Sequence, residues 1–119
     1  MRIAILVVAA ALTASTAQAR QAGPCFTIHG RLSIYNGSLV HRIWPTHSHR
    51  LLAVVNRSGD YDESKPPIPP SLQQVFDRDP EARIFAVFRL CPATRGRAGV
   101  MQHVYFAGAR HIAIVASGH

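Results

Sequence analysis

Residues 25–44 read CFTIHGRLSIYNGSLVHRIW, and this stretch has the pattern of two strands joined by a tight turn. Over residues 26–34, apolar residues alternate with polar ones, which is typical of a strand with one buried face. Asn36 and Gly37 follow directly, and both tolerate the positive φ that a two-residue hairpin turn requires. We therefore expect an antiparallel partner strand over residues 39–44.

The rest of the chain adds short strands and one helix. Further strands are expected at residues 49–55, 84–91, 100–107 and 110–116. Gly30 predicts a bulge or a strong bend within the first strand, and Gly108 a bend before the last one. Ser71 is the expected N-cap of a helix of about two turns, which Pro80 ends.

This element order predicts a mostly β (α+β) fold. Three strands, a helix and then two or three strands are the order of a small OB-like antiparallel barrel of five or six strands, with the helix between the third and fourth. A sandwich of antiparallel strands covered by one helix fits the same order.

The N-terminus has the features of an export signal. Arg2 precedes an apolar run over residues 3–12, and Ala17-Gln18-Ala19 matches the small residues that a signal peptidase requires. A membrane anchor is the alternative, but the run is shorter than a bilayer span. We expect a signal peptide at 1–19, a single mature domain at 20–119 that does not span a membrane, and a periplasmic or secreted location.

The chain contains two cysteines. In an exported protein of this size, a pair of cysteines predicts one structural disulfide, between Cys25 and Cys91.

Charge is distributed unevenly along the chain. Thirteen Lys and Arg residues oppose six carboxylates, and all six carboxylates lie between Asp60 and Glu81. Residues 56–70 are expected to form an exposed acidic and proline-rich loop. The basic remainder would attract an anionic envelope component, such as a glycan or a lipid head group. Scattered solvated arginines are the simpler alternative, and export makes a nucleic-acid partner unexpected.

A longer pattern accompanies these features: CFTxHGRLS at 25–33, NG at 36–37, RIW at 42–44, RLL at 50–52 and CP at 91–92. In this pattern the chain resembles a group of small secreted bacterial proteins of unassigned function. The resemblance implies export and the disulfide, and it implies no activity.

Seven histidines suggest a metal site. His47 and His49 would face the same way in an extended segment, and His41 on the neighbouring strand is a candidate third ligand. Neutral imidazoles favour zinc or copper. Surface histidines without a metal are the alternative, in which case the protein has no cofactor.

The face of an OB-like barrel offers a second kind of site, because arginines and aromatic side chains there can contact a ligand. The candidates are Arg31, Tyr35, Arg42, Trp44 and Arg50. Alternatively, Trp44 caps the core. The expected function is a small cell-envelope interaction or ligand-binding module; the alternatives are a His-rich periplasmic metal-binding protein and an enzyme of unrecognised type, although no catalytic residues can be named.

Overall fold

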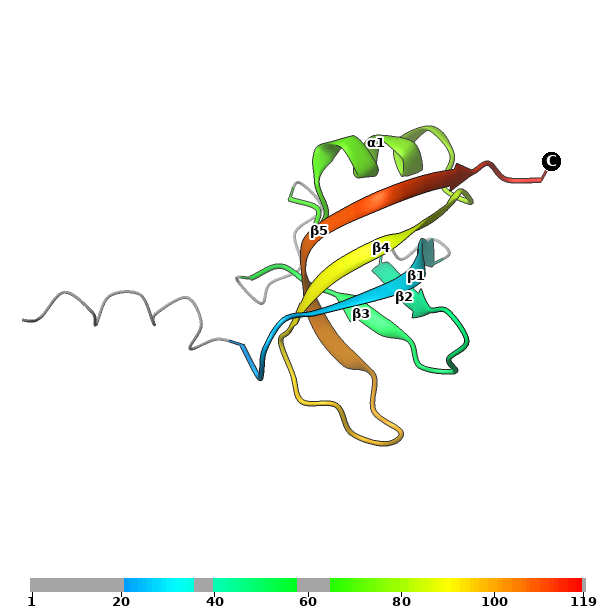
Figure 1. Ribbon diagram of the computed structural model, residues 1–119. Helices are drawn as coiled ribbons and strands as arrows, with labels where there is room; N and C mark the ends of the chain where they lie inside the picture. The colour runs from blue at the N-terminus through cyan, green and yellow to red at the C-terminus, as the bar shows by residue number, and fades with distance from the viewer. Residues whose placement is uncertain (1–20, 36–39, 58–64, 119) are drawn as a thin grey trace, which may run out of the picture.

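Five strands and one helix occupy the part of the chain that the computed structural model describes, residues 21–35, 40–57 and 65–118 (Figure 1). They are β1 (Phe26–Tyr35), β2 (Val40–Pro45), β3 (Leu52–Val54), α1 (Pro70–Arg78), β4 (Arg83–Pro92) and β5 (Gln102–Val115). No helix within these residues is long and apolar enough to cross a membrane. The expected signal peptide at 1–19 and the hairpin turn at 36–37 lie outside the described residues.

The strands form a closed barrel in the order β1-β2-β3-β5-β4, and β1 pairs with β4 to complete the ring. The predicted barrel, with its helix between the third and fourth strands, is therefore confirmed. Four pairings are antiparallel, as expected, whereas β3 and β5 run parallel. An odd number of strands requires this, because directions that alternate around a ring of five cannot match where the ring closes.

The last two expected strands are in fact one. β5 runs without interruption past Gly108, and Figure 1 shows it curving from the lower end of the barrel to the side of α1. Two register shifts against β4 accompany this curve, and His111 has a positive φ of 54°. Bulges bend a strand without ending it, so the bend expected at Gly108 lies within one long strand, beside the register shift between Arg89 and Leu90.

Gly30 does not form the expected bulge. The register continues through it on both sides, with Pro45 opposite on β2 and Ala86 opposite on β4. A Cβ at this position would lie 3.0 Å from the carbonyl oxygen of Trp44 and 3.1 Å from Cγ2 of Ile43. The glycine therefore allows β1 and β2 to approach closely.

The helix begins two residues earlier than expected. Its N-cap is Pro69, no side chain caps it, and Pro70 occupies the first turn, so Ser71 is not the cap. Proline suits this position because its φ is already helical and its missing N–H would have no partner there.

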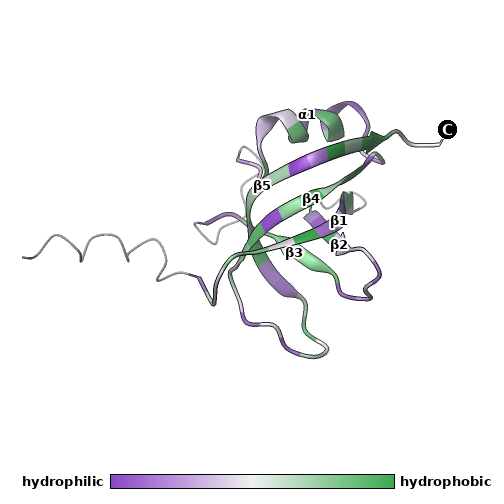
Figure 2. Cartoon of the chain, viewed as in Figure 1, coloured by the Kyte–Doolittle hydropathy of each residue, from purple (hydrophilic) through white to green (hydrophobic). Residues whose placement is uncertain are grey.

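The core fills the barrel and extends under α1. Leu32, Ile43 and Phe88 are fully buried, and Leu72 and Phe76 of α1 close one end. Figure 2 shows hydrophobic bands along β4 and β5, separated by shorter hydrophilic ones. Ile68, in the loop predicted to be exposed, is only 5 % exposed and joins this core.

The predicted disulfide is present. Cys25 and Cys91 are joined by an S–S bond of 2.05 Å, which links the residue before β1 to the end of β4. It therefore reinforces the pairing that closes the barrel. A structural disulfide indicates a non-reducing compartment.

Removing the disulfide should lower the stability of the barrel. The bridge closes a loop of 66 residues, for which the loss of entropy in the unfolded chain gives about 4 kcal/mol. We expect the double variant Cys25→Ser/Cys91→Ser to unfold at a clearly lower urea concentration than the oxidised protein. An unchanged midpoint would show that the strand pairing needs no covalent support.

Candidate functional site

Three outward side chains form a row across β2, β1 and β4. Arg31 on β1 lies directly opposite Trp44 on β2 and Phe85 on β4. Trp44 and Phe85 are each 38 % exposed, a large fraction for aromatic side chains. The guanidinium carbon of Arg31 lies 4.8 Å from the centroid of the Trp44 ring, within the range of a cation–π interaction. We call these three residues the aromatic shelf.

Trp44 lies outside the barrel and does not cap its core. Its indole N–H donates a hydrogen bond of 3.0 Å to the carbonyl oxygen of Ser48. This bond fixes the ring and ties the turn after β2 to the shelf. A hollow of about 520 Å³ opens over the shelf, and His47 and His49 complete its lining.

Three buried polar atoms on this face have no hydrogen-bond partner among the residues that the structure describes. They are the Nε of Arg31, the Nε of Arg42 and the hydroxyl of Ser33. Leaving such a group unsatisfied costs about 1–3 kcal/mol. Two of the three are guanidinium Nε atoms, which are buried away from solvent and from an incoming ligand.

The other predicted ligand-binding residues fall into two groups. Tyr35 and Arg42 lie beside the shelf, and the guanidinium carbon of Arg42 is 5.3 Å from the Tyr35 ring centroid. Arg50 lies apart from them, in the connection between β2 and β3. There its Nη2 donates a hydrogen bond to Oε1 of Gln102 on β5.

His41 points into the barrel at the end that α1 covers. Its side chain is 5 % exposed, and its Nε2–H donates a 2.7 Å hydrogen bond to Oε1 of Gln73 on α1. The direction follows from Gln73, whose Nε2 donates to Oδ1 of Asp77 at 3.0 Å, leaving Oε1 for the histidine. Its ring packs edge-on against Phe76, with the centroids 6.1 Å apart. His41 therefore belongs to the contact between β2 and α1.

The structure does not bring the predicted metal ligands together. Thr46 and His47 form a turn in which His47 has a φ of 61°, so the expected extended segment is absent. His47 and His49 line the outer hollow, on the other side of the barrel wall from His41. Across the described residues, no group of three or more His, Cys, Asp or Glu side chains could hold a metal ion.

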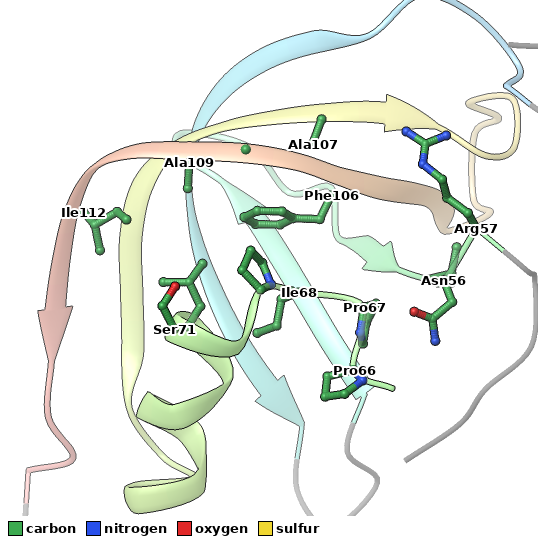
Figure 3. Close-up of a pocket in the computed structure, with 14 residues that line it drawn as sticks. Asn56, Arg57, Pro66, Pro67, Ile68, Ser71, Phe106, Ala107, Ala109 and Ile112 are labelled. Atoms are coloured by element: carbon green, nitrogen blue, oxygen red, sulfur yellow. The ribbon is translucent and has the colours of Figure 1, made fainter. Parts of the chain in front are cut away.

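A separate cleft lies between β5 and the prolines that precede α1 (Figure 3). It measures about 510 Å³, and Pro66, Pro67, Ile68 and Phe106 form much of its lining. Arg57 stands at its edge, with its guanidinium carbon 4.8 Å from the Tyr105 ring centroid. Residues 58–64, which join this edge to Lys65, lie outside the described residues, so we assign no ligand to the cleft.

Comparisons with known proteins assign no function to these sites. The chain matches no family model, no curated protein and no solved structure. The resemblance to small secreted bacterial proteins therefore stays a prediction, and function has to be argued from the geometry alone.

The buried His41 should make stability depend on pH. Burial lowers the pKa of His41 below its ordinary value of 6.5, against the opposing effect of the Gln73 hydrogen bond. As pH falls below 6.5, the unfolded chain takes up a proton that the folded protein resists, so stability decreases until the pH passes the folded-state pKa.

We expect urea midpoints measured between pH 7.5 and 5 to fall more steeply for the native protein than for His41→Gln. His103→Gln, which changes an exposed histidine, should follow the native protein. Parallel curves for all three proteins would contradict the assignment.

Proposed function

We propose that the protein is a periplasmic or secreted ligand-binding module that binds an acidic glycan of the cell envelope on the aromatic shelf. The observation that carries this proposal is the register of the barrel, which sets Arg31 between two exposed aromatic residues, Trp44 and Phe85. An apolar surface with a few well-placed polar groups is the usual composition of a small-ligand site. OB-like barrels bind oligosaccharides on their strand faces.

Each part of the shelf supports one part of the ligand. The flat ring of Trp44 offers a surface against which the C–H face of a sugar can pack, and its fixed position lowers the entropy lost on binding. Arg31 offers a planar set of N–H donors that matches the geometry of a carboxylate.

Neutral partners leave the positive charge of this face available. Arg31 and Arg42 are held by the aromatic rings of Trp44 and Tyr35. A carboxylate partner would neutralise a guanidinium, whereas an aromatic ring does not. Together with the net charge of +7, these contacts favour an anionic ligand over a neutral one.

Trigalacturonate, a short acidic oligosaccharide, tests the proposal against maltotriose, a neutral one of equal length. We expect calorimetry to show saturable binding of trigalacturonate. Trp44→Ala should weaken it by about tenfold, equivalent to about 1.4 kcal/mol. Because the chain contains one tryptophan, the fluorescence of Trp44 in the native protein should change on binding.

Arginine variants separate a specific contact from general charge attraction. Arg31→Gln should remove the preference for trigalacturonate over maltotriose, whereas Arg78→Gln, an equal change of charge on α1, should retain it. Equal affinities of the native protein and Trp44→Ala for trigalacturonate would exclude the shelf as the binding site.

A further inference from the structure

The end of the barrel away from α1 carries a cluster of arginines. Figure 1 shows the loop between β4 and β5, residues 93–101, at this end. Arg50 meets this loop from the connection between β2 and β3, and it lines two adjoining hollows of about 620 and 580 Å³. Arg97 lines the first hollow and Arg95 the second. We call Arg50, Arg95 and Arg97 with these two hollows the arginine basin.

We propose that the arginine basin binds a phosphate group. The proposal is independent of the glycan site, because the basin shares none of the three shelf residues.

A buried amide holds the central arginine in place. Gln102 is 9 % exposed; its Nε2 donates to the carbonyl oxygen of Thr94 at 2.9 Å, which directs its Oε1 towards Nη2 of Arg50. The bond uses one of the five N–H donors of the guanidinium. Arg50 is therefore positioned without being neutralised, and Gln102 also lines both hollows.

The loop that carries the other two arginines is tied to β5. The hydroxyl of Thr94 accepts a 2.9 Å hydrogen bond from the His103 N–H, and the Ala93 N–H donates to the His103 carbonyl oxygen at 2.8 Å. A turn follows, with the Val100 N–H bonded to the Arg97 carbonyl oxygen at 3.1 Å. These bonds define the path of the loop before any ligand arrives, which lowers the entropy lost on binding.

No carboxylate of the described part of the chain lines the basin. Within the described residues, the carboxylates are Asp77, Asp79 and Glu81, on α1 and in the turn after it, at the other end of the barrel. Asp79 accepts the Ser117 N–H there at 2.7 Å. The arginines therefore face the hollows without an acidic competitor among these residues.

Phosphate fits this arrangement better than a carboxylate does. One guanidinium can satisfy both oxygens of a carboxylate, whereas a phosphate presents three or four oxygens and favours several converging donors. Gly96, between Arg95 and Arg97, lies beside the central guanidinium, because a Cβ there would be in ordinary van der Waals contact with Nη2 of Arg50 at 3.5 Å.

The phosphate could belong to a soluble ester or to a lipid head group, and two probes distinguish these sources. We expect calorimetry to show saturable binding of glycerol 3-phosphate if the ligand is soluble. Sedimentation with phosphatidylglycerol vesicles, compared with pure phosphatidylcholine vesicles, detects a lipid head group. A positive result in either arm supports the phosphate site, and the absence of binding in both would overturn it.

Variants locate the binding. Arg50→Gln should weaken phosphate binding at least tenfold. Arg97→Gln should weaken it at least threefold, and this exposed loop position carries no risk to folding. Arg78→Gln, with the same loss of charge on α1, should change it less than twofold, and so should Trp44→Ala, which removes the shelf. Equal losses in Arg50→Gln and Arg78→Gln would show attraction to net charge only and would overturn the proposal.

Discussion

The pairing of β1 with both β2 and β4 is the constraint on which the rest of the structure depends. It buries Leu32 completely and, one residue earlier, places Arg31 outside between Trp44 and Phe85. Because side chains alternate along a strand, a shift of one residue would exchange these positions and put the guanidinium in the core. The packing of Leu32 thus determines the register of the shelf, and the disulfide from Cys25 reinforces that register where the barrel closes.

Much of this architecture could be predicted from local patterns. Alternation located the strands, and the two cysteines predicted the disulfide. Features that depend on the closed ring of strands could not be predicted from short stretches of sequence. The parallel pairing of β3 with β5 follows from closing a ring of five strands. β5 continues past Gly108 because bulges allow it to curve. Ile68 looked like part of a polar loop because its neighbours in sequence are polar or proline. In the fold it packs into the core together with Leu72 and Phe76 of α1.

The kinds of residue in the candidate sites could be predicted from the sequence, but which of these residues lie together in space could not always be predicted. Arg31 and Trp44 are close in sequence and pair between neighbouring strands, so both could be identified within residues 25–44. Phe85 was missed because its place beside Arg31 depends on the pairing of β1 with β4. Its position immediately after the buried Ile84 was the available sign that it points outward. His41 was grouped with His47 and His49 as a ligand from the neighbouring strand, although strand alternation turns it inward, towards Gln73.

The same kind of contact occurs at both proposed binding sites: an uncharged group holds the guanidinium, Trp44 at Arg31 and Gln102 at Arg50. An aromatic ring or an amide fixes the side chain and leaves its charge intact, whereas a salt bridge would fix it and cancel the charge. Beyond about 8–10 Å, salt screens exposed charges, so net charge alone would attract any anion and select none. Selectivity must therefore come from the shape around each arginine. At Arg31 that shape is a flat aromatic row, which suits a sugar ring; at Arg50 it is a glycine-containing loop with further guanidinium groups, which suits a compact anion with several oxygens. His49 lines the hollows beside both, so the two sites adjoin, yet each presents its own arginine in its own surroundings.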